Sequence, residues 1–327
     1  MRKPKFYSPT SISLFYTNRE EYYLKYLADS RPPRLPQTKP MSVGSAFDAY
    51  VKSYLHKQVF DTLDPKFTFD ALFEAQVEEQ NREFAREAGR ICFQYYKKYG
   101  LADLMSELET ATEDPVFEFK VEGNIRHKSK TPIPLHGYPD LYFKSSAGFV
   151  VYDWKVNGYC SKSNTSPAKG YISVKGPERI RGINKSHKDA VPMMHNGIMI
   201  NAGTTMEYVN EKWADQLSVY AWLLGEPVGS PFIVGIDQLA CGPTDEGEPS
   251  FIRIAKHRCK VSDNYQEDLM SRIVKMIEII ESGIILELPK DQALERQNLL
   301  DQYYLAYEGD DPKDKWFQNM SRQHSNF

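Results

Sequence analysis

The chain has 327 residues, of which 41% are hydrophobic, and a formal net charge of −3. This length and composition predict a globular protein with a real core, and the near-neutral charge excludes a globally basic, nucleic-acid-binding surface. No window approaches the roughly 18 apolar residues of a membrane helix, and no apolar h-region follows the basic N-terminus, so we expect a cytoplasmic protein without a membrane partner. The cysteines form no CxxC pair, which favours free thiols and no zinc.

Helices are expected through residues 1–110. Residues 11–27 begin with serines that can cap free N–H groups, and they carry a Tyr/Leu stripe at helical spacing. After a proline-rich loop, apolar residues at helical spacing predict a second helix over residues 42–57. A longer, heavily charged helix is predicted over residues 70–99, where a glycine follows.

The hydrophobic period changes from 3.6 to 2 at the start of the expected catalytic core, residues 111–260. Three strands are predicted over residues 116–125, 133–143 and 148–156, and a short turn joins the last two as a hairpin. An irregular insertion follows at residues 159–203. A segment of that length without periodicity inside a domain is usually functional or mobile.

The remaining elements complete a mixed sheet. Periodicity predicts an amphipathic helix over residues 211–224, strands over 230–241 and 250–261, and closing helices over 265–281 and 292–307. The order of elements predicts one α/β domain over residues 1–327, in which a mixed central β-sheet is flanked by helices and residues 261–327 form the C-terminal helices.

The stretch from Gly137 to Gly158 places Asp140, Asp153 and Lys155 inside two runs that otherwise have the pattern of buried strands. An ionised carboxylate in a sheet core costs several kcal/mol unless it is paired or binds a cation. Because strand side chains alternate, Asp153 and Lys155 share one face of their strand. A hairpin closed by the short turn puts Asp140 opposite Asp153, within about 5 Å. Two adjacent carboxylates repel, so we expect a divalent cation between them.

Oxygen ligands without histidine or cysteine suit Mg²⁺, for which Mn²⁺ can substitute, and Mg²⁺ commonly shares its coordination with substrate phosphates. This combination predicts phosphodiester hydrolysis, in which Lys155 orients or deprotonates the attacking water and stabilises charge on the phosphate. Taken singly, Gly-Tyr-Pro-Asp is more often a turn and Asp-x-Lys more often a salt-bridged edge strand. Their occurrence in one hairpin, in this order, favours the metal site.

Four motifs in order resemble the PD-(D/E)XK nuclease superfamily and, within it, the RecB-like exonuclease branch. Asp140 followed by Asp153-Trp154-Lys155 resembles the superfamily signature, and residues 8–27 resemble the serine-rich helix start of the branch. "SVGSAFDAYV" resembles its Val-Gly-Thr helix, and Gln216 with Tyr220 resembles its Gln-x-x-x-Tyr helix. The resemblance implies a restriction-endonuclease-like core and a metal-dependent exodeoxyribonuclease.

The resemblance also implies a set of site residues. The catalytic residues are Asp140, Asp153, Lys155, Gln216 and Tyr220; the metal ligands are Asp140, Asp153, the backbone carbonyl of Trp154, Asp48 and Glu118. Gln216 and Tyr220 share a helix face and could bind a substrate phosphate or brace Lys155. Glu122 has the same strand parity as Glu118 and stays an alternative to it.

Two positions depart from the pattern of the branch. Where iron–sulfur members have their first cluster cysteine, this chain has Thr17, and no closing cysteine triplet follows, so no iron–sulfur cluster is expected. Where most members have a histidine ligand, this chain has Phe47 followed by Asp48. Either Asp48 replaces the histidine or that ligand is lost.

The insertion at residues 159–203 is locally basic. Its only acidic residues are Glu178 and Asp189. Its basic residues are Lys162, Lys169, Lys175, Arg179, Arg181, Lys185 and Lys188. Such an excess could follow a phosphate backbone, and Tyr159 and Tyr171 could stack on a frayed base. A solvated loop is the alternative. The position of the insertion directly after the metal-site strand favours DNA contact.

These observations predict a Mg²⁺-dependent deoxyribonuclease, an exonuclease that hydrolyses phosphodiester bonds at single- or double-stranded DNA ends in recombination, repair or phage DNA metabolism. The alternatives are a structure-specific endonuclease of the same fold, a catalytically weakened DNA-end-binding module, and a small-phosphoester hydrolase, which the basic insertion disfavours. No GxxxxGK[ST] loop is present, so no ATP motor is expected. A recombination partner protein and a homo-oligomer, as in ring-forming relatives, are left open.

Overall fold

The computed structural model describes residues 2–29, 35–62, 64–128, 132–157, 193–195, 198–201, 205–241 and 252–283. The chain divides into two compact units, Met1–Pro36 with Ser271–Phe327, and Gln37–Met270. The predicted organisation as a single nuclease domain stays a prediction. Across the described ranges, no helix is both long enough and apolar enough to cross a lipid bilayer.

The smaller unit begins with three short helical segments where the sequence predicts one helix over residues 11–27. They are α1 (Pro9–Thr17), α2 (Arg19–Tyr22) and the π-helical turn η1 (Tyr23–Leu27). The side chains of Ser8 and Ser11 each accept a hydrogen bond from the other's backbone N–H, which caps α1. The break lies at Asn18, whose side chain accepts from the N–H of Glu21 and so starts α2.

The larger unit begins with helices. They are α3 (Lys39–Phe60), η2 (Pro65–Phe67), α4 (Phe69–Gln76), η3 (Glu79–Asn81), α5 (Arg82–Tyr99) and α6 (Leu101–Glu109). The single helix predicted over residues 70–99 is therefore divided, because Val77 adopts an extended backbone. Helix α6 was not predicted. Helix α3 starts earlier than predicted, since Thr38 caps it and Pro40 fits its first turn.

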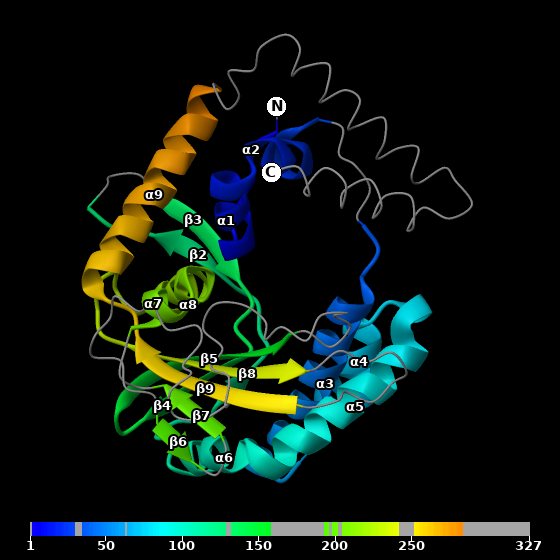
Figure 1. Ribbon diagram of the computed structural model, residues 1–327. Helices are drawn as coiled ribbons and strands as arrows, with labels where there is room; N and C mark the ends of the chain where they lie inside the picture. The colour runs from blue at the N-terminus through cyan, green and yellow to red at the C-terminus, as the bar shows by residue number, and fades with distance from the viewer. Residues whose placement is uncertain are drawn as a thin grey trace. The chain divides into compact units, whose positions relative to one another are not determined.

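A seven-stranded mixed sheet forms the centre of the larger unit, as the sequence predicts (Figure 1). Its strands, in spatial order, are β1 (Val116–Phe117), β4 (Leu141–Ser145), β5 (Gly148–Asn157), β8 (Ile233–Cys241), β9 (Ile252–Lys260), β7 (Ile198–Asn201) and β6 (Met193–His195). Strands β5 and β8 pair in parallel, whereas β5 pairs with β4, and β8 with β9, in antiparallel fashion. The fold class is therefore α/β with a mixed central sheet.

Two predicted strands are each divided between two sheets. Residues 116–125 form β1 and β2 (Val121–Ile125), and residues 133–143 form β3 (Ile133–Gly137) and β4. Strands β2 and β3 make a separate antiparallel pair beside α8 (Glu211–Leu223). The divisions fall at Glu118, which has a positive φ of 30°, and at Pro139, which has no N–H for a ladder.

Gly137 allows α8 to approach the end of β3 closely. A Cβ atom at this position would lie 2.2 Å from the ring of Tyr220, closer than any side chain tolerates. Glycine is therefore required where the chain leaves β3 for Asp140.

Helices cover both faces of the sheet. On one face, Val150, Tyr152 and Trp154 of β5 pack in a core with α3, α5 and α6. On the other, Phe149 and Val151 pack with α8 and the short helix α7 (Met206–Val209), and Figure 1 shows α8 lying over β5 and β8. The side chains along residues 148–156 therefore alternate between the two faces of the sheet, which confirms the prediction made from the hydrophobic period of 2.

Two further predictions concern described residues. Helix α9 (Asp263–Ser282) confirms the helix predicted over residues 265–281, whereas residues 292–307 lie outside the described ranges. Cys92 and Cys259 are buried thiols outside any disulfide.

Candidate metal centre

The β4–β5 hairpin brings two carboxyl groups together. Leu141 pairs with Tyr152, so the next position along both strands sets Asp140 opposite Asp153, the register that the sequence predicts. Oδ2 of Asp140 accepts a hydrogen bond of 3.2 Å from the backbone N–H of Trp154. The two carboxyl groups interact, since the charge of Asp140 raises the pKa of Asp153.

Strand β5 and helix α8 place three more predicted residues at this point. Lys155 donates to Oδ2 of Asp153 from the same face of β5. Nε2 of Gln216 lies 2.8 Å from the same Oδ2 and 3.0 Å from the hydroxyl of Tyr220, which is one helical turn further on. Gln216 thus contacts Asp153 rather than bracing Lys155. All five residues predicted as catalytic are within one contact network, although their roles are not tested by it.

Helix α3 adds a carboxyl group and an ammonium group. The side chain of Phe47 is 1% exposed and packs in the core against Tyr96, whereas Asp48, one helical position later, faces Asp140. Nζ of Lys52 lies 2.6 Å from Oδ2 of Asp48 and 2.9 Å from Oδ1 of Asp140. The sequence interpretation missed Lys52, although its spacing of four residues from Asp48 places both on one helix face.

Glu118 completes the group. Its Oε2 lies 3.1 Å from Nζ of Lys52, and Nε2 of Gln76 donates to that same oxygen at 2.8 Å and to Oδ2 of Asp48 at 3.2 Å. The alternative, Glu122, instead pairs with Lys120 on the β2–β3 ribbon and is away from this group. Gln76 was also missed, and no sequence signal distinguishes it from other polar residues of its helix.

These contacts define what we call the carboxylate cluster. Its members are Asp48, Lys52, Glu118, Asp140, Asp153 and Lys155. Four carboxyl groups face two ammonium groups, so the fully ionised cluster carries an excess of two negative charges. This excess equals the charge of one divalent cation.

The electrostatics of the cluster raise the pKa of two of its acids and lower that of a third. Burial raises the pKa of Asp48 to about 7, with Asp140 adding to the shift and Lys52 opposing it. Burial, and then the Asp140 carboxylate, raise the pKa of Asp153 well above its usual range. Burial would raise the pKa of Asp140, but the ammonium groups of Lys52 and Lys155 and the contact with Asp153 together outweigh it, and this pKa is lowered.

Both lysines stay charged. Burial would lower the pKa of Lys52 and of Lys155, but the surrounding carboxylates outweigh it and raise both values. For Lys155 the largest such contribution comes from Asp153. Each ammonium is therefore a fixed positive charge at neutral pH and a poor proton acceptor.

The cluster fits a hard divalent cation by the chemistry of its donors. All its acidic ligands are oxygen atoms, and Oδ1 of Asp48 is buried with no hydrogen-bond partner among the described residues. Within those residues, however, no three acidic, histidine or cysteine side chains already stand in a shared coordination geometry. Lys52 lies between three of the four carboxyl groups, which explains that finding.

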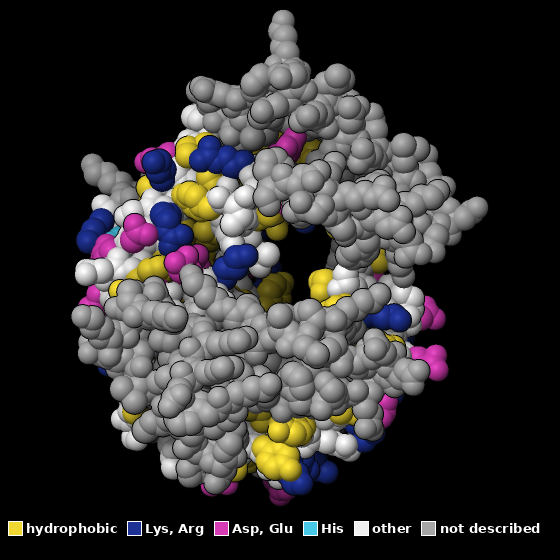
Figure 2. Space-filling view, viewed as in Figure 1, with side chains coloured by type: hydrophobic (Ala, Val, Ile, Leu, Met, Phe, Trp, Pro, Cys, Tyr) yellow, Lys and Arg dark blue, Asp and Glu magenta, His cyan; other side chains and the backbone are white. Residues whose placement is uncertain are grey.

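The predicted DNA-binding residues lie outside the residues that the structure describes. They are Lys162, Lys169, Lys175, Arg179, Arg181, Lys185 and Lys188. On the face shown in Figure 2, the basic and acidic side chains of the described residues are interspersed rather than gathered by sign.

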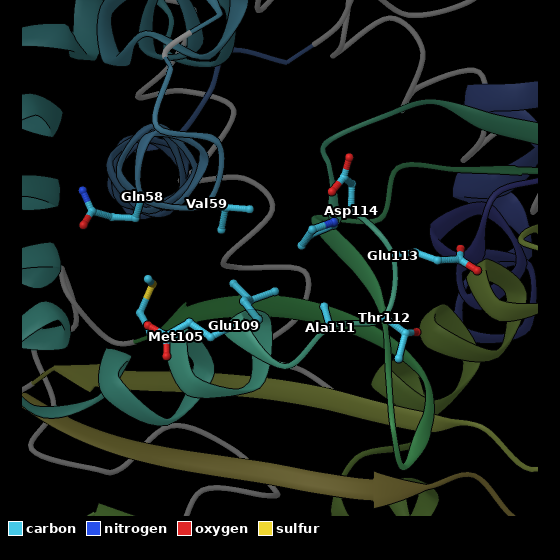
Figure 3. A pocket seen from close by; sticks show the side chains of 10 residues that line it. Gln58, Val59, Met105, Glu109, Ala111, Thr112, Glu113 and Asp114 are labelled. Atoms are coloured by element: carbon cyan, nitrogen blue, oxygen red, sulfur yellow. The ribbon is translucent and has the colours of Figure 1, made fainter.

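A separate pocket lies away from the cluster. It has a volume of about 320 Å³ and is lined by the end of α3, by α6 and by residues 111–115, with no residue of the cluster. Figure 3 shows Glu109, Glu113 and Asp114 among its side chains. Three acidic groups at the wall disfavour a phosphate ligand in this pocket.

Residues 7–170 match the family model of the PD-(D/E)XK nuclease superfamily. No curated protein matches the chain. A solved structure described as that of SSO0001 aligns at 9% identity over 81% of this chain and 85% of that chain, with a TM-score of 0.25. The protein VC1899 from Vibrio cholerae aligns at 11% identity over 49% and 42% of the two chains, with a TM-score of 0.15. At these TM-scores, neither likeness supports an argument.

Proposed function

Because the chain belongs to the PD-(D/E)XK nuclease superfamily, we propose that it is a Mg²⁺-dependent deoxyribonuclease with its active site at the carboxylate cluster. One observation carries this proposal. Asp140 and Asp153 converge from neighbouring strands, and Lys155 contacts Asp153 from the same strand face. Two carboxylates beside a fixed positive charge suit a metal ion and a phosphate group.

The proposed metal ligands are Asp140, Asp153 and the backbone carbonyl of Trp154, with Asp48 as a further ligand in place of the usual histidine. Glu118 supports the site through the contact that Gln76 makes with it and with Asp48. A bound Mg²⁺, or Mn²⁺ in its place, supplies a Lewis acid for the scissile phosphate and lowers the pKa of the attacking water. No iron–sulfur cluster is part of the proposal.

The protein's own residues stabilise charge and hold geometry. Lys155 keeps its proton because its pKa is raised, so it orients the attacking water and stabilises charge on the phosphate rather than acting as a general base. Gln216 holds Asp153 through a hydrogen bond, and Tyr220 holds Gln216. Asp153 is thereby kept in one position on the α8 side of β5.

We further propose that the chain is a member of the RecB-like branch, a single nuclease domain that acts at DNA ends in recombination, repair or phage DNA metabolism. The contacts among Asp153, Gln216 and Tyr220 support it, since that branch has a Gln-x-x-x-Tyr helix. The basic insertion at residues 159–203 would follow the DNA backbone. We propose that it acts in the cytoplasm of a bacterium or of a phage-infected host. A recombination partner and a homo-oligomer stay open.

A second candidate is a catalytically weakened DNA-end-binding module. The presence of Lys52 between three carboxyl groups favours it, because an ammonium there competes with a metal ion. A structure-specific endonuclease of the same fold is the remaining alternative, and no described contact distinguishes it from an exonuclease.

Purified protein incubated with labelled linear and closed-circular DNA tests these readings in Mg²⁺, Mn²⁺ or EDTA. We expect cation-dependent release of nucleotides from linear DNA only, and its loss in Asp153→Asn. Asp70→Asn, which changes a carboxylate that is 69% exposed and paired with Arg86 at the surface, is the matched control. Nicking of circles would favour the endonuclease, and binding without cleavage would favour the module. Cleavage in EDTA, or undiminished cleavage by Asp153→Asn, would contradict the proposal.

A further inference from the structure

Lys52 is an ammonium group enclosed by the site that should bind the metal. Its side chain is 2% exposed, and its Nζ lies 2.6 Å from Asp48, 2.9 Å from Asp140 and 3.1 Å from Glu118. Burial of an unpaired ammonium costs several kcal/mol, so this position is tolerable only because three carboxylates surround it. The three distances are those of charge-assisted hydrogen bonds.

Asp140 is shared between this ammonium and the β5 side of the site. Its Oδ1 faces Lys52, whereas its Oδ2 accepts from the backbone N–H of Trp154 and thus faces the strand that carries Asp153. A carboxylate can hold two cations side by side when each of its two oxygen atoms contacts a different cation. Hydrolases with two metal ions hold them about 3.5–4 Å apart in this way.

Gln76 keeps the other two acids directed at Lys52. Its amide donates to the same oxygen atoms, Oε2 of Glu118 and Oδ2 of Asp48, that contact Nζ of Lys52. Those two oxygens are thereby held on the α3 side of Asp140.

We propose that Lys52 takes the place of a second divalent cation, so that the site binds one ion, on the Asp140–Asp153 side. The inference rests on the proposed metal-dependent function. With Lys52 present, the excess of two negative charges is neutralised by one divalent ion. Without Lys52 the excess is three, and Asp48, Glu118 and Asp140 become ligands for another ion.

The test counts Mn²⁺ ions bound per chain, by isothermal titration calorimetry and electron paramagnetic resonance, without DNA. Wild type is expected to bind one ion, and Lys52→Met, which keeps the length of the side chain without its charge, to bind two. The matched control is Lys144→Met, which removes a lysine paired with Glu113 on the surface and should keep the wild-type count.

A double variant separates charge from fold. Lys52→Met/Glu118→Gln removes one carboxylate together with the ammonium and should return the count to one ion. Lys52→Met should also melt at a lower temperature than wild type in EDTA and recover more of that loss on addition of Mn²⁺. If the variant is unfolded in EDTA, Mn²⁺ should refold it, because the ion replaces the ammonium.

Equal ion counts in wild type and Lys52→Met, including none in either, would overturn the assignment. Failure of Mn²⁺ to refold an unfolded Lys52→Met would overturn it too. The deoxyribonuclease proposal fails differently: a wild-type protein that binds one ion, gains a second in Lys52→Met, and cleaves no DNA would contradict the function and leave the role of Lys52 intact.

Discussion

Two buried polar regions meet β5, and they differ in how their charges are matched. One is the carboxylate cluster. The other, here called the Asp237–Arg258 network, contains Tyr96, Tyr152, Asp237 and Arg258. Nη1 of Arg258 lies 3.3 Å from Oδ1 of Asp237, the hydroxyl of Tyr96 lies 2.6 Å from Oδ2 of Asp237, and Nη2 of Arg258 lies 2.6 Å from the hydroxyl of Tyr152.

The pKa of Asp237 in the network and those of two cluster acids, Asp48 and Asp153, are shifted in opposite directions. Burial alone would raise the pKa of Asp237, but the nearby cations, Arg258 first, and two tyrosine hydroxyl groups together outweigh it, and the pKa of this carboxyl is lowered. In the cluster, burial and neighbouring acids raise the pKa of Asp48 and Asp153. A buried acid with its own cation stabilises the fold, whereas acids in excess of their cations create a binding site for another one.

Trp154 connects the two regions. Its indole Nε1 donates to the hydroxyl of Tyr96 at 3.1 Å, and its backbone N–H donates to Asp140 at 3.2 Å. The network therefore helps to fix the segment of β5 that carries part of the cluster. Substitutions in each region test whether the network mainly supports stability and the cluster mainly supports function.

Asp153→Asn should have the largest effect and leave the protein folded. Loss of a charged ligand beside Lys155 is expected to reduce DNA cleavage by about 1,000-fold, which corresponds to about 4 kcal/mol of transition-state stabilisation. The measurements are cleavage of labelled linear DNA and the thermal midpoint in EDTA, with Asp70→Asn as control. If Asp153→Asn unfolds and its folded fraction keeps full activity, Asp153 serves stability rather than function, which would contradict this prediction.

Asp237→Asn should do the reverse. It leaves Arg258 buried beside a neutral amide, so the free energy of unfolding should fall by about 3 kcal/mol, measured by urea denaturation. The affinity of the folded protein for Mn²⁺ should stay at the wild-type value. Asp70→Asn breaks an ion pair with Arg86 in which both side chains are exposed, and it should cost less than about 1 kcal/mol. Equal costs for the two variants would argue against a stabilising network.

His257 gives the sheet a dependence on acid, from the face that α8 covers, where its ring lies against Trp213. Burial lowers the pKa of His257 to about 4, with Arg258 adding to the shift and Asp237 opposing it. Because the folded pKa is below the unfolded value of about 6.5, the unfolded state takes up a proton first, and stability falls as the pH falls through that window.

The free energy of unfolding of the wild type should therefore drop by about 2 kcal/mol more than that of His257→Gln between pH 7 and pH 5. Chemical denaturation of both proteins at each pH measures the difference. Parallel pH profiles would show that His257 does not contribute.

Tyr220→Phe should have the smallest effect. It removes the hydroxyl group that accepts from Gln216 while keeping the ring that packs against Gly137. We expect cleavage to fall about 5-fold, or about 1 kcal/mol, with little change in the thermal midpoint. Tyr99→Phe, at a tyrosine that is 44% exposed on α5, is the control. A loss as large as that of Asp153→Asn would mean that the hydroxyl acts on the substrate directly.

The sequence by itself determined the features that depend on local periodicity. Alternation along residues 148–156 fixed which side chains share a face, and a short turn fixed the register that sets Asp140 opposite Asp153. Both follow from backbone geometry over a few residues, and for that reason the hairpin part of the site could be predicted.

Only the tertiary structure decided which distant residues meet this hairpin. Lys52 is 88 residues from Asp140, and Tyr96 is 141 residues from Asp237, so no local pattern links either pair. The positive φ of Glu118 likewise divides a predicted strand and turns a carboxyl group toward Lys52. Periodicity states which face of an element is covered, but the packing of the whole chain sets the charges that cover it, and those charges determine whether a carboxylate stabilises the fold or binds a cation.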